Sequence, residues 1–403
     1  MPTSDQYWAL PDGISEALPD ESWRLEHLRR ALLDMYLTWG YRQVMPPMVE
    51  YMQSLSTGLG SHLDVQTFKV TDQLTGRMMG IRADMTPQIA RIDAHKLRTE
   101  EPNRLCYIGT VLRTRAFSND GSRSPLQVGA ELFGHAGIDS DLEIITLLLE
   151  TLAICHVPNI TLDIGHVGIF RGLIQEAGLN ATQERDFYNM LERKAIPEIQ
   201  NWLKQMDLPH DAAQRLAQLP YLYGSPTVLA QARQVLAGAG QAVEQALDYL
   251  DELVQQLRQC IPSCELHIDL TELSGYDYHT GVVYAAYTPA YGKEIARGGR
   301  YDGIGRLFGR DRPATGFSTD LRTLNYYQQQ TPELPRTILA PRGTETALLN
   351  KIATLRQAGY RVIRQLGDAR LQSTQAADPQ QQLIKQNNEW VVVTVNSENG
   401  TES

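Results

Sequence analysis

Two glycine-rich polar clusters on either side of an apolar run constrain the fold of this chain more than any other feature. The clusters are residues 275–281 and 296–303, and residues 282–287 between them form an alternating run. This pattern is typical of antiparallel strands whose ends carry aromatic, carboxylate and guanidinium groups. Polar aromatics beside glycines favour a small-molecule pocket, although a tyrosine-rich hairpin with tight turns would give the same local pattern. Residues 271–324 are therefore expected to hold either a binding site or a plain hairpin.

Length and composition limit the class of protein. A chain of 403 residues with 42% hydrophobic and 21% charged residues is typical of a soluble globular protein with two or three domains. The net charge of −10 argues against broad, nonspecific binding of nucleic acid. The first residues lack the basic region and apolar core of a signal peptide, and no apolar run reaches membrane-spanning length. We expect a cytoplasmic protein without a membrane partner.

The cysteines do not indicate a metal site. They are Cys106, Cys155, Cys260 and Cys264. The last two are four positions apart, without a second pair or a histidine cluster nearby, which disfavours zinc. We expect reduced thiols, no metal and no cofactor.

The first half of the chain predicts a helix followed by short strands. Residues 21–39 place apolar side chains at three- and four-residue spacing, so they predict an amphipathic helix. A second helix is expected to begin with Thr86 as its N-cap and Pro87 at its first helical position. An apolar helix over residues 141–155 should lie against the sheet. Strands are predicted at residues 41–47, 67–70, 77–82, 105–113, 127–133 and 160–164.

One predicted strand, residues 127–133, has faces of opposite character. Gln127, Gly129 and Glu131 share one face, and apolar residues 128, 130 and 132 share the other. A polar face of this kind is either solvated or the floor of a binding site. The loop before it, residues 118–125, is expected to be mobile from its composition.

The domain organisation changes after the first third of the chain. Helical patterns dominate residues 168–258, which predicts a helical insertion between parts of one sheet whose strands resume at residues 265–270. The main body should span residues 1–328 and be followed by a linker at 329–335. Residues 336–403 predict a small α/β unit with strands at 337–340, 360–363 and 390–395, a helix at 345–357 and a polar, strandless region at 372–386.

Taken together, the segments resemble the class II aminoacyl-tRNA synthetase core, and specifically histidyl-tRNA synthetase, over roughly residues 5–325. The resemblance implies an α+β fold, an antiparallel sheet flanked by helices, with a helical insertion and a small C-terminal α/β unit. It is carried by six segments in order: residues 40–47, 81–86, 107–113, 127–134, 276–280 and 298–303.

The resemblance also implies a histidine pocket. Asp84 and Thr86 stand where the family holds the substrate's α-ammonium group, which needs carboxylate and hydroxyl acceptors. Asp84 could instead be only a carboxylate at a helix N-terminus. His279 stands where the synthetases carry a second tyrosine. The implied histidine-binding residues are Asp84, Thr86, Arg113, Gln127, Glu131, Tyr278, His279 and Tyr301.

The chain departs from the synthetase pattern where ATP would bind. Arg113 keeps the arginine of the second class motif, but Arg115 replaces the following glutamate. Ser274 stands where the synthetases have an arginine that acts in activation, and Asp320 and Thr323 replace a glycine and a phosphate-binding arginine. Adenylation needs cations against the triphosphate, and losing one preorganised donor typically costs on the order of 100- to 1,000-fold in rate. We expect the aminoacylation chemistry to be lost.

A synthetase-like chain of this kind resembles the regulatory subunits of ATP phosphoribosyltransferase. That resemblance implies a non-catalytic subunit that the short-form catalytic subunit needs for the first step of histidine biosynthesis. It also implies feedback inhibition by bound L-histidine, a hetero-octamer built from synthetase-like dimers, and no binding of tRNA. Two alternatives stay open: a divergent, active histidyl-tRNA synthetase, and a synthetase paralogue with another ligase or RNA-related role.

Overall fold

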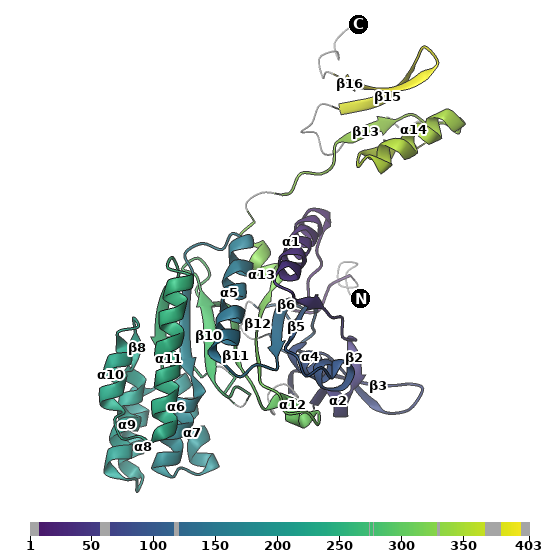
Figure 1. The fold of residues 1–403 in the computed structure, drawn as a ribbon. Helices are drawn as coiled ribbons and strands as arrows, with labels where there is room; N and C mark the ends of the chain where they lie inside the picture. Colours follow the sequence, from purple (N-terminus) through teal and green to yellow (C-terminus); the bar gives the residue numbers. More distant parts are fainter. Residues whose placement is uncertain are drawn as a thin grey trace. The chain divides into compact units, whose positions relative to one another are not determined.

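The computed structural model describes residues 8–56, 65–116, 121–273, 275–276, 278–328, 331–366 and 380–395. The chain forms two compact units, Met1–Gln330 and Thr331–Ser403 (Figure 1). Two residues of the pocket stretch, Ser274 and Asp277, lie outside the described residues, as do part of the loop expected to be mobile and the first two residues of the expected linker.

A large sheet is the framework of the first unit. Within the described residues it has nine strands in the order β1-β5-β6-β12-β11-β10-β7-β9-β8. The pairs β1–β5 and β7–β9 are parallel and the others are antiparallel. The strands are β1 Arg42–Gln43, β5 Asn103–Thr110, β6 Leu126–Phe133, β7 Thr161–His166, β8 Tyr223–Gly224, β9 Glu265–Asp269, β10 Val282–Tyr287, β11 Glu294–Arg300 and β12 Ala314–Asp320.

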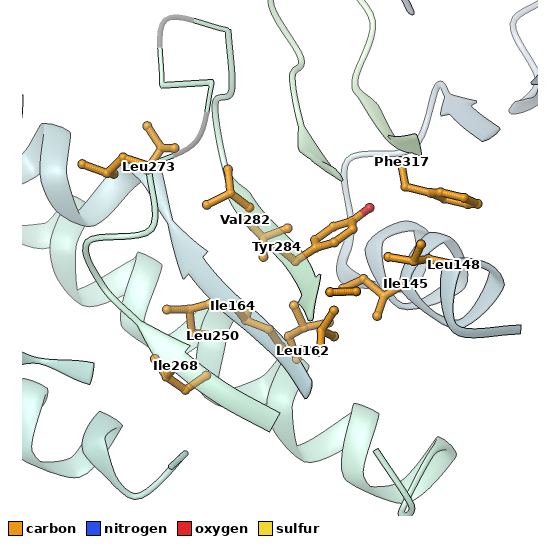
Figure 2. Close-up of a cluster of buried hydrophobic side chains, with 14 of the residues drawn as sticks. Ile145, Leu148, Leu162, Ile164, Leu250, Ile268, Leu273, Val282, Tyr284 and Phe317 are labelled. Atoms are coloured by element: carbon orange, nitrogen blue, oxygen red, sulfur yellow. The ribbon is translucent and has the colours of Figure 1, made fainter. Parts of the chain in front are cut away.

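Helices α1 Pro19–Thr38, α5 Ile138–Ile154 and α13 Leu321–Asn325 pack on one face of this sheet. The predicted amphipathic helix and the predicted apolar helix are confirmed by α1 and α5. Ile145 and Leu148 of α5 lie against Tyr284 and Phe317 of the sheet (Figure 2). Removing such apolar surface from water is the main stabilising contribution to a core.

A buried ion pair fixes the sheet to α5. Arg300 on β11 donates through Nε to Asp141 at 3.0 Å, and their side chains are 5% and 0% exposed. The same guanidinium donates to Ser140 Oγ at 2.7 Å. Burial opposes the charged form of Arg300, but the Asp141 carboxylate outweighs it and the pKa of Arg300 is raised.

Helices between β7 and β9 gather at one end of the sheet (Figure 1). Because β7 and β9 pair in parallel, the chain must cross over between them, as predicted from the helical pattern. The crossover consists of α6 Val167–Ala177, α7 Ala181–Glu192, α8 Ile196–Gln205, α9 His210–Gln218, the short η3 Leu219–Tyr221, α10 Val228–Val235 and α11 Gln241–Cys260.

The opposite face of the sheet is covered by shorter elements. They are α2 Met52–Ser56, α4 Thr86–Ile92, η2 Asp93–Leu97, α12 Ile304–Leu307 and a small antiparallel sheet of β2 Val49–Tyr51, β4 Met78–Ile81 and β3 Phe68–Thr71. A second apolar cluster joins Met85 and Ile89 of this layer to Leu105, Tyr107 and Phe133 of the sheet. The pocket described below opens on this face.

The second unit is a four-stranded sheet with one helix, among the residues described there. The strands lie in the order β14-β13-β15-β16, where β13 is parallel to β14 and to β15, and β16 is antiparallel to β15. Ile338, Leu348, Ile352 and Leu383 form its core. The elements are β13 Thr337–Ala340, α14 Thr346–Gln357, β14 Arg361–Arg364, β15 Gln380–Gln386 and β16 Glu389–Val395.

Two predictions about strands were wrong. Residues 41–47 form only the two-residue β1, because the prolines at 46 and 47 have no N–H group to extend the pairing with β5. The region 372–386, predicted to lack a strand, contains β15. Its polar residues pair along their whole length with β16, and Leu383 is buried at 1% exposure. No helix among the described residues is long and apolar enough to cross a membrane.

Candidate functional site

The segment before α4 is fixed to the end of β5. Arg82 is buried and donates to the carbonyls of Thr110 at 2.9 Å and Pro46 at 2.8 Å. Two residues later, Asp84 accepts a hydrogen bond from the backbone N–H of Thr86 at 2.9 Å. The carboxylate of Asp84 therefore lies at the start of α4, where the helix leaves backbone N–H groups without helical partners.

The prediction that Thr86 is the N-cap of this helix was wrong. Met85 occupies the cap position in a helical conformation without a side-chain cap bond. The hydroxyl of Thr86 instead donates to Glu131 at 2.9 Å and lies 3.1 Å from the hydroxyl of Tyr107. The buried Glu131 carboxyl group offers this hydroxyl an acceptor on the sheet, so the side chain turns towards the sheet and does not cap the helix.

Glu131 on β6 is the centre of this network. Its exposure is 1%, and among the described residues hydroxyl groups of Thr86, Tyr107 and Tyr301 donate to its two oxygens, Tyr107 at 2.9 Å. The pKa of Glu131 is raised to about 8. Burial is the main cause and the nearby charge of Asp84 adds to it, while the hydroxyl bonds oppose the shift. The site therefore holds a carboxyl group that a cationic or hydrogen-bonding ligand can ionise near neutral pH.

Aromatic rings form one wall beside Glu131. Tyr278 stacks on Tyr301 with ring centroids 5.0 Å apart and an interplanar angle of 24°. His279 meets Tyr278 edge-on at 5.6 Å. The hydroxyl of Tyr278 is buried and has no hydrogen-bond partner in the part of the chain that the structure describes. A buried hydroxyl without a partner is unfavourable, so this group is suited to a bound polar ligand.

Glycines leave the sheet bare beneath these side chains. Gly316 on β12 lies opposite Glu131, and an added Cβ would lie 1.6 Å from the Glu131 carboxylate. A Cβ at Gly299 would lie 2.8 Å from the His279 ring, and one at Gly129 would lie 2.4 Å from a backbone carbonyl. An added side chain would clash at each of these three positions, and Gly316 is the one among them that lines the cavity, so backbone forms the floor there.

The result is a cavity of about 850 Å³. Of the residues predicted to bind histidine, Asp84, Thr86, Glu131, Tyr278, His279 and Tyr301 line it. A cavity against the strands of residues 271–324 favours the pocket interpretation of that stretch over the plain hairpin.

Gln127 and Arg113 lie just behind this lining. Gln127 donates to Asp84 at 3.1 Å and accepts from the N–H of Met85 at 2.9 Å, so it positions Asp84. The Nε of Arg113 donates to the carbonyl of Ala83 at 3.2 Å. Burial lowers the pKa of Arg113 to about 10. The eight predicted residues thus converge on one region of the fold, although their role towards a ligand stays a prediction.

Sequence reasoning missed the contribution of α7. Residues of this helix line the cavity, and the segment before Tyr278 joins them: Tyr276 donates to Glu184 and stacks on Tyr188 at 5.5 Å and 28°. Gln66 and Arg297 were also missed. No local pattern signals these contacts, because they depend on how the insertion packs against the sheet. The cavity-lining residues of α7 are Ala181, Glu184, Arg185, Tyr188, Asn189 and Glu192.

Asp320 and Thr323, two of the expected departures from the synthetase pattern, are hydrogen-bonded to each other. Asp320 accepts from the N–H of Arg322 at 3.1 Å, from the N–H of Leu126 at 2.9 Å and from the hydroxyl of Thr323 at 3.1 Å. Burial raises the pKa of Asp320, and these hydrogen bonds oppose the shift. Asp320 thus caps α13. Arg115 is exposed, and the replaced arginine position at Ser274 lies outside the described residues.

The cysteines have unremarkable surroundings. Cys106 and Cys155 are buried, Cys260 is exposed and Cys264 is half-buried, and all are free thiols. Burial raises the pKa of Cys106 and Cys155 to about 12, which leaves them unreactive. Within the described ranges, no group of three or more histidine, cysteine, aspartate or glutamate side chains could hold a metal ion.

Comparisons with known proteins match both units. The family described as histidyl-tRNA synthetase matches residues 13–324, and the one described as the ATP phosphoribosyltransferase subunit HisZ C-terminal domain matches residues 335–393. The chain is 56% identical over 372 residues to an ATP phosphoribosyltransferase regulatory subunit of Thioalkalivibrio sulfidiphilus, covering 91% of this chain and 94% of the relative. It is 49% identical over 398 residues to that of Pseudomonas fluorescens, covering 98% and 100%.

Solved structures agree with this relationship. A Bacillus halodurans structure, described as an ATP phosphoribosyltransferase regulatory subunit/histidyl-tRNA synthetase, has a TM-score of 0.80 and 26% identity and covers 91% of this chain and 94% of its own. A histidyl-tRNA synthetase from Nostoc has a TM-score of 0.76 at 20% identity, covering 96% and 97%, which shows the shared fold alone. The α+β, synthetase-like fold expected from the sequence is confirmed, and the chain belongs to the family of ATP phosphoribosyltransferase regulatory subunits.

Proposed function

We propose that this chain is the non-catalytic, histidine-sensing subunit of an ATP phosphoribosyltransferase. The short-form catalytic subunit needs it for the first step of histidine biosynthesis, and bound L-histidine turns the complex off. Family membership supports the partner. The single observation that supports the ligand is the buried Glu131 carboxyl group beside Tyr278, whose hydroxyl has no partner among the described residues.

In this proposal, histidine binds in one orientation. The imidazole ring lies between the aromatic wall and Glu131, where the Glu131 carboxyl group and the Tyr278 hydroxyl meet its ring nitrogens. The α-ammonium group lies towards Asp84 and Thr86, and Gln127 fixes the Asp84 carboxylate. A buried carboxyl group near neutral pKa can either accept from the imidazole or donate to it, since both groups titrate in the same range.

Aminoacylation is absent in this proposal. Asp320 is committed to capping α13, and Thr323 donates to it instead of offering a cation. A carboxylate at this place disfavours the triphosphate of ATP. The net charge of −10 likewise supports a subunit that does not bind tRNA.

The assembly we propose is a hetero-octamer built from synthetase-like dimers. Support for self-association comes from the small sheet, where Val49 of β2 and Val70 of β3 are exposed apolar side chains on the same face. Exposed apolar patches commonly mark protein interfaces. A body of residues 1–328 carries the ligand site in this scheme, a linker follows at 329–335, and residues 336–403 form the second unit.

The experiment is reconstitution with a short-form catalytic subunit. We expect co-purification, phosphoribosyl transfer that depends on this chain, and inhibition by L-histidine. Asp84→Asn should keep the activity and lose the inhibition. Glu100→Gln is a matched control, because the Glu100 side chain is 95% exposed and does not line the cavity.

Two outcomes would contradict the proposal. Robust ATP–pyrophosphate exchange, or charging of tRNA by the purified chain, would make it an active synthetase. Failure to bind or stimulate any short-form catalytic subunit would assign it to another paralogue of the synthetases. For the assembly, light scattering should give a dimer for the chain alone, and Val70→Glu should weaken it.

A further inference from the structure

An amino acid brings a carboxylate into the cavity as well as an ammonium group, and most charges on the cavity wall are negative. Asp84, Glu131, Glu184 and Glu192 line the cavity. A buried or half-buried carboxylate of the ligand needs a cation, because an unpaired charge loses its hydration without compensation. The choice of a cation that binds this carboxylate rests on the proposed function, because it assumes an amino-acid ligand.

Arg297 is a cation on the sheet side of the cavity. It belongs to β11, where it pairs with Ala285 of β10 and Ser318 of β12. Alternation along the strand puts it on the same face as Gly299, the face on which Glu131 also lies. Arg297 lines the cavity.

Sheet geometry gives the span between Arg297 and Glu131. Gly299 and Gly316 lead from β11 across β12 to Glu131 on β6, so the two residues are two strands and two positions apart. With strands about 4.8 Å apart and about 3.4 Å per residue, their Cα atoms are roughly 12 Å apart along the diagonal. The glycines leave that diagonal open to a ligand, which can meet Glu131 at one end and the extended arginine at the other.

The other cations nearby are less suited. Arg185 lines the cavity from α7, but it is an exposed residue on the outer helix. Arg113 lies behind the lining and donates to the carbonyl of Ala83. Arg297 donates to Glu294 at 3.2 Å, and both side chains are 39% exposed. Such a half-exposed ion pair is weak, so a ligand carboxylate can compete for the guanidinium.

A second observation relates Arg297 to the region of Asp84 and Arg113. Burial is the main cause that lowers the pKa of Arg113. The positive charge of Arg297 also lowers it, whereas the carboxylates of Asp84 and Asp320 oppose the shift. Arg113 is therefore within electrostatic range both of Asp84, which is proposed to meet the ligand's ammonium group, and of Arg297. A carboxylate and a cation that both act on Arg113 suit a zwitterion, whose ammonium and carboxylate groups are attached to one carbon atom.

We propose that Arg297 binds the α-carboxylate of the amino-acid ligand through a bidentate guanidinium–carboxylate contact. The charge then comes from β11, whereas the resemblance to the synthetases implies an arginine at the position of Ser274. Such a site binds an amino acid more tightly than the corresponding alcohol or amine, because these lack the carboxylate.

The test is calorimetry of the full chain with L-histidine and with L-histidinol, which lacks the carboxylate. Wild-type protein should bind L-histidine about 10- to 100-fold more tightly than L-histidinol, as expected for a charge-assisted contact. Arg297→Ala should lose that factor for L-histidine and leave L-histidinol binding unchanged. Arg297→Lys should be intermediate, since lysine cannot form the bidentate contact. Arg185→Ala is the control and should change neither ligand.

The outcomes separate the two proposals. Retained L-histidinol binding also shows that a variant is folded. Suppose that wild-type protein binds L-histidine. If Arg297→Ala then weakens the binding of both ligands equally, or weakens the binding of neither, the assignment of Arg297 is wrong and the histidine site stands. If Arg185→Ala alone removes the preference for L-histidine, the ligand carboxylate is bound by Arg185 of α7. If wild-type protein binds neither ligand, the histidine-sensing function itself fails.

Discussion

The buried carboxyl group of Glu131 should make the stability of the protein fall as the pH rises. Its ordinary pKa is 4.5, and in the folded protein it is raised to about 8, first of all by burial. Between these values the folded chain keeps a proton that the unfolded chain has released, so rising pH favours unfolding. Below the ordinary pKa both states are protonated and the effect vanishes.

The size of the effect follows from linkage. Each pH unit within the window changes the free energy of unfolding by about 1.4 kcal/mol, so the interval from about pH 5 to about pH 7.5 is worth about 3 kcal/mol. Glu131→Gln removes the titration and keeps the shape of the side chain. We therefore expect wild type to lose about 3 kcal/mol relative to Glu131→Gln over this interval.

Urea unfolding followed by tryptophan fluorescence and far-ultraviolet circular dichroism at several pH values measures this difference. Glu26→Gln is the control, because Arg29 and Arg30 lower the pKa of Glu26 to about 2. Its removal changes no titration above about pH 5. Parallel stability curves for wild type and Glu131→Gln would refute the reasoning, since they would mean that Glu131 is ionised in the folded protein throughout.

Three further predictions concern the floor, the wall and the frame of the site. Gly316→Ala should abolish L-histidine binding and cost about 1–3 kcal/mol through overpacking, as measured by calorimetry and thermal unfolding; Gly303→Ala, with no atom within 4 Å of the added Cβ, should be neutral. Tyr278→Phe should leave the ligand-free protein as stable or up to about 1 kcal/mol more stable, because it removes an unpartnered buried hydroxyl, while weakening L-histidine several-fold; a destabilised variant would mean that the hydroxyl has a partner. Arg300→Met should cost about 3–5 kcal/mol by leaving a buried carboxylate unpaired, and adding Asp141→Leu should restore much of it; a double variant no better than the single one would argue against the ion pair.

Much of the fold could be predicted because local patterns agree with it. Along β6 the alternation of polar and apolar residues placed Glu131 on the cavity face and Val128 in the opposite core, as the structure has them. The spacing of apolar residues in α1 likewise identified its buried side. These features depend on residues close in the sequence, where the period of the side chains decides which face is buried.

The remainder depends on contacts between distant segments. The hydroxyl of Thr86 had a good local reason to cap α4, but Glu131, forty-five positions away, competes for it successfully. The strand β15 exists because β16 offers a partner for its backbone, a fact that its own polar composition hides. The wall supplied by α7 depends on the contact of Tyr276 with Glu184, ninety-two positions apart.

The bare glycine floor has a consequence for the regulation of a biosynthetic pathway. Any glycine codon becomes an alanine codon by a single base change, and at Gly316 the added methyl group would fall on the Glu131 carboxylate. If this cavity binds histidine, a single point mutation in β12 is enough to remove feedback control. Strains selected for histidine overproduction should therefore collect substitutions at Gly316.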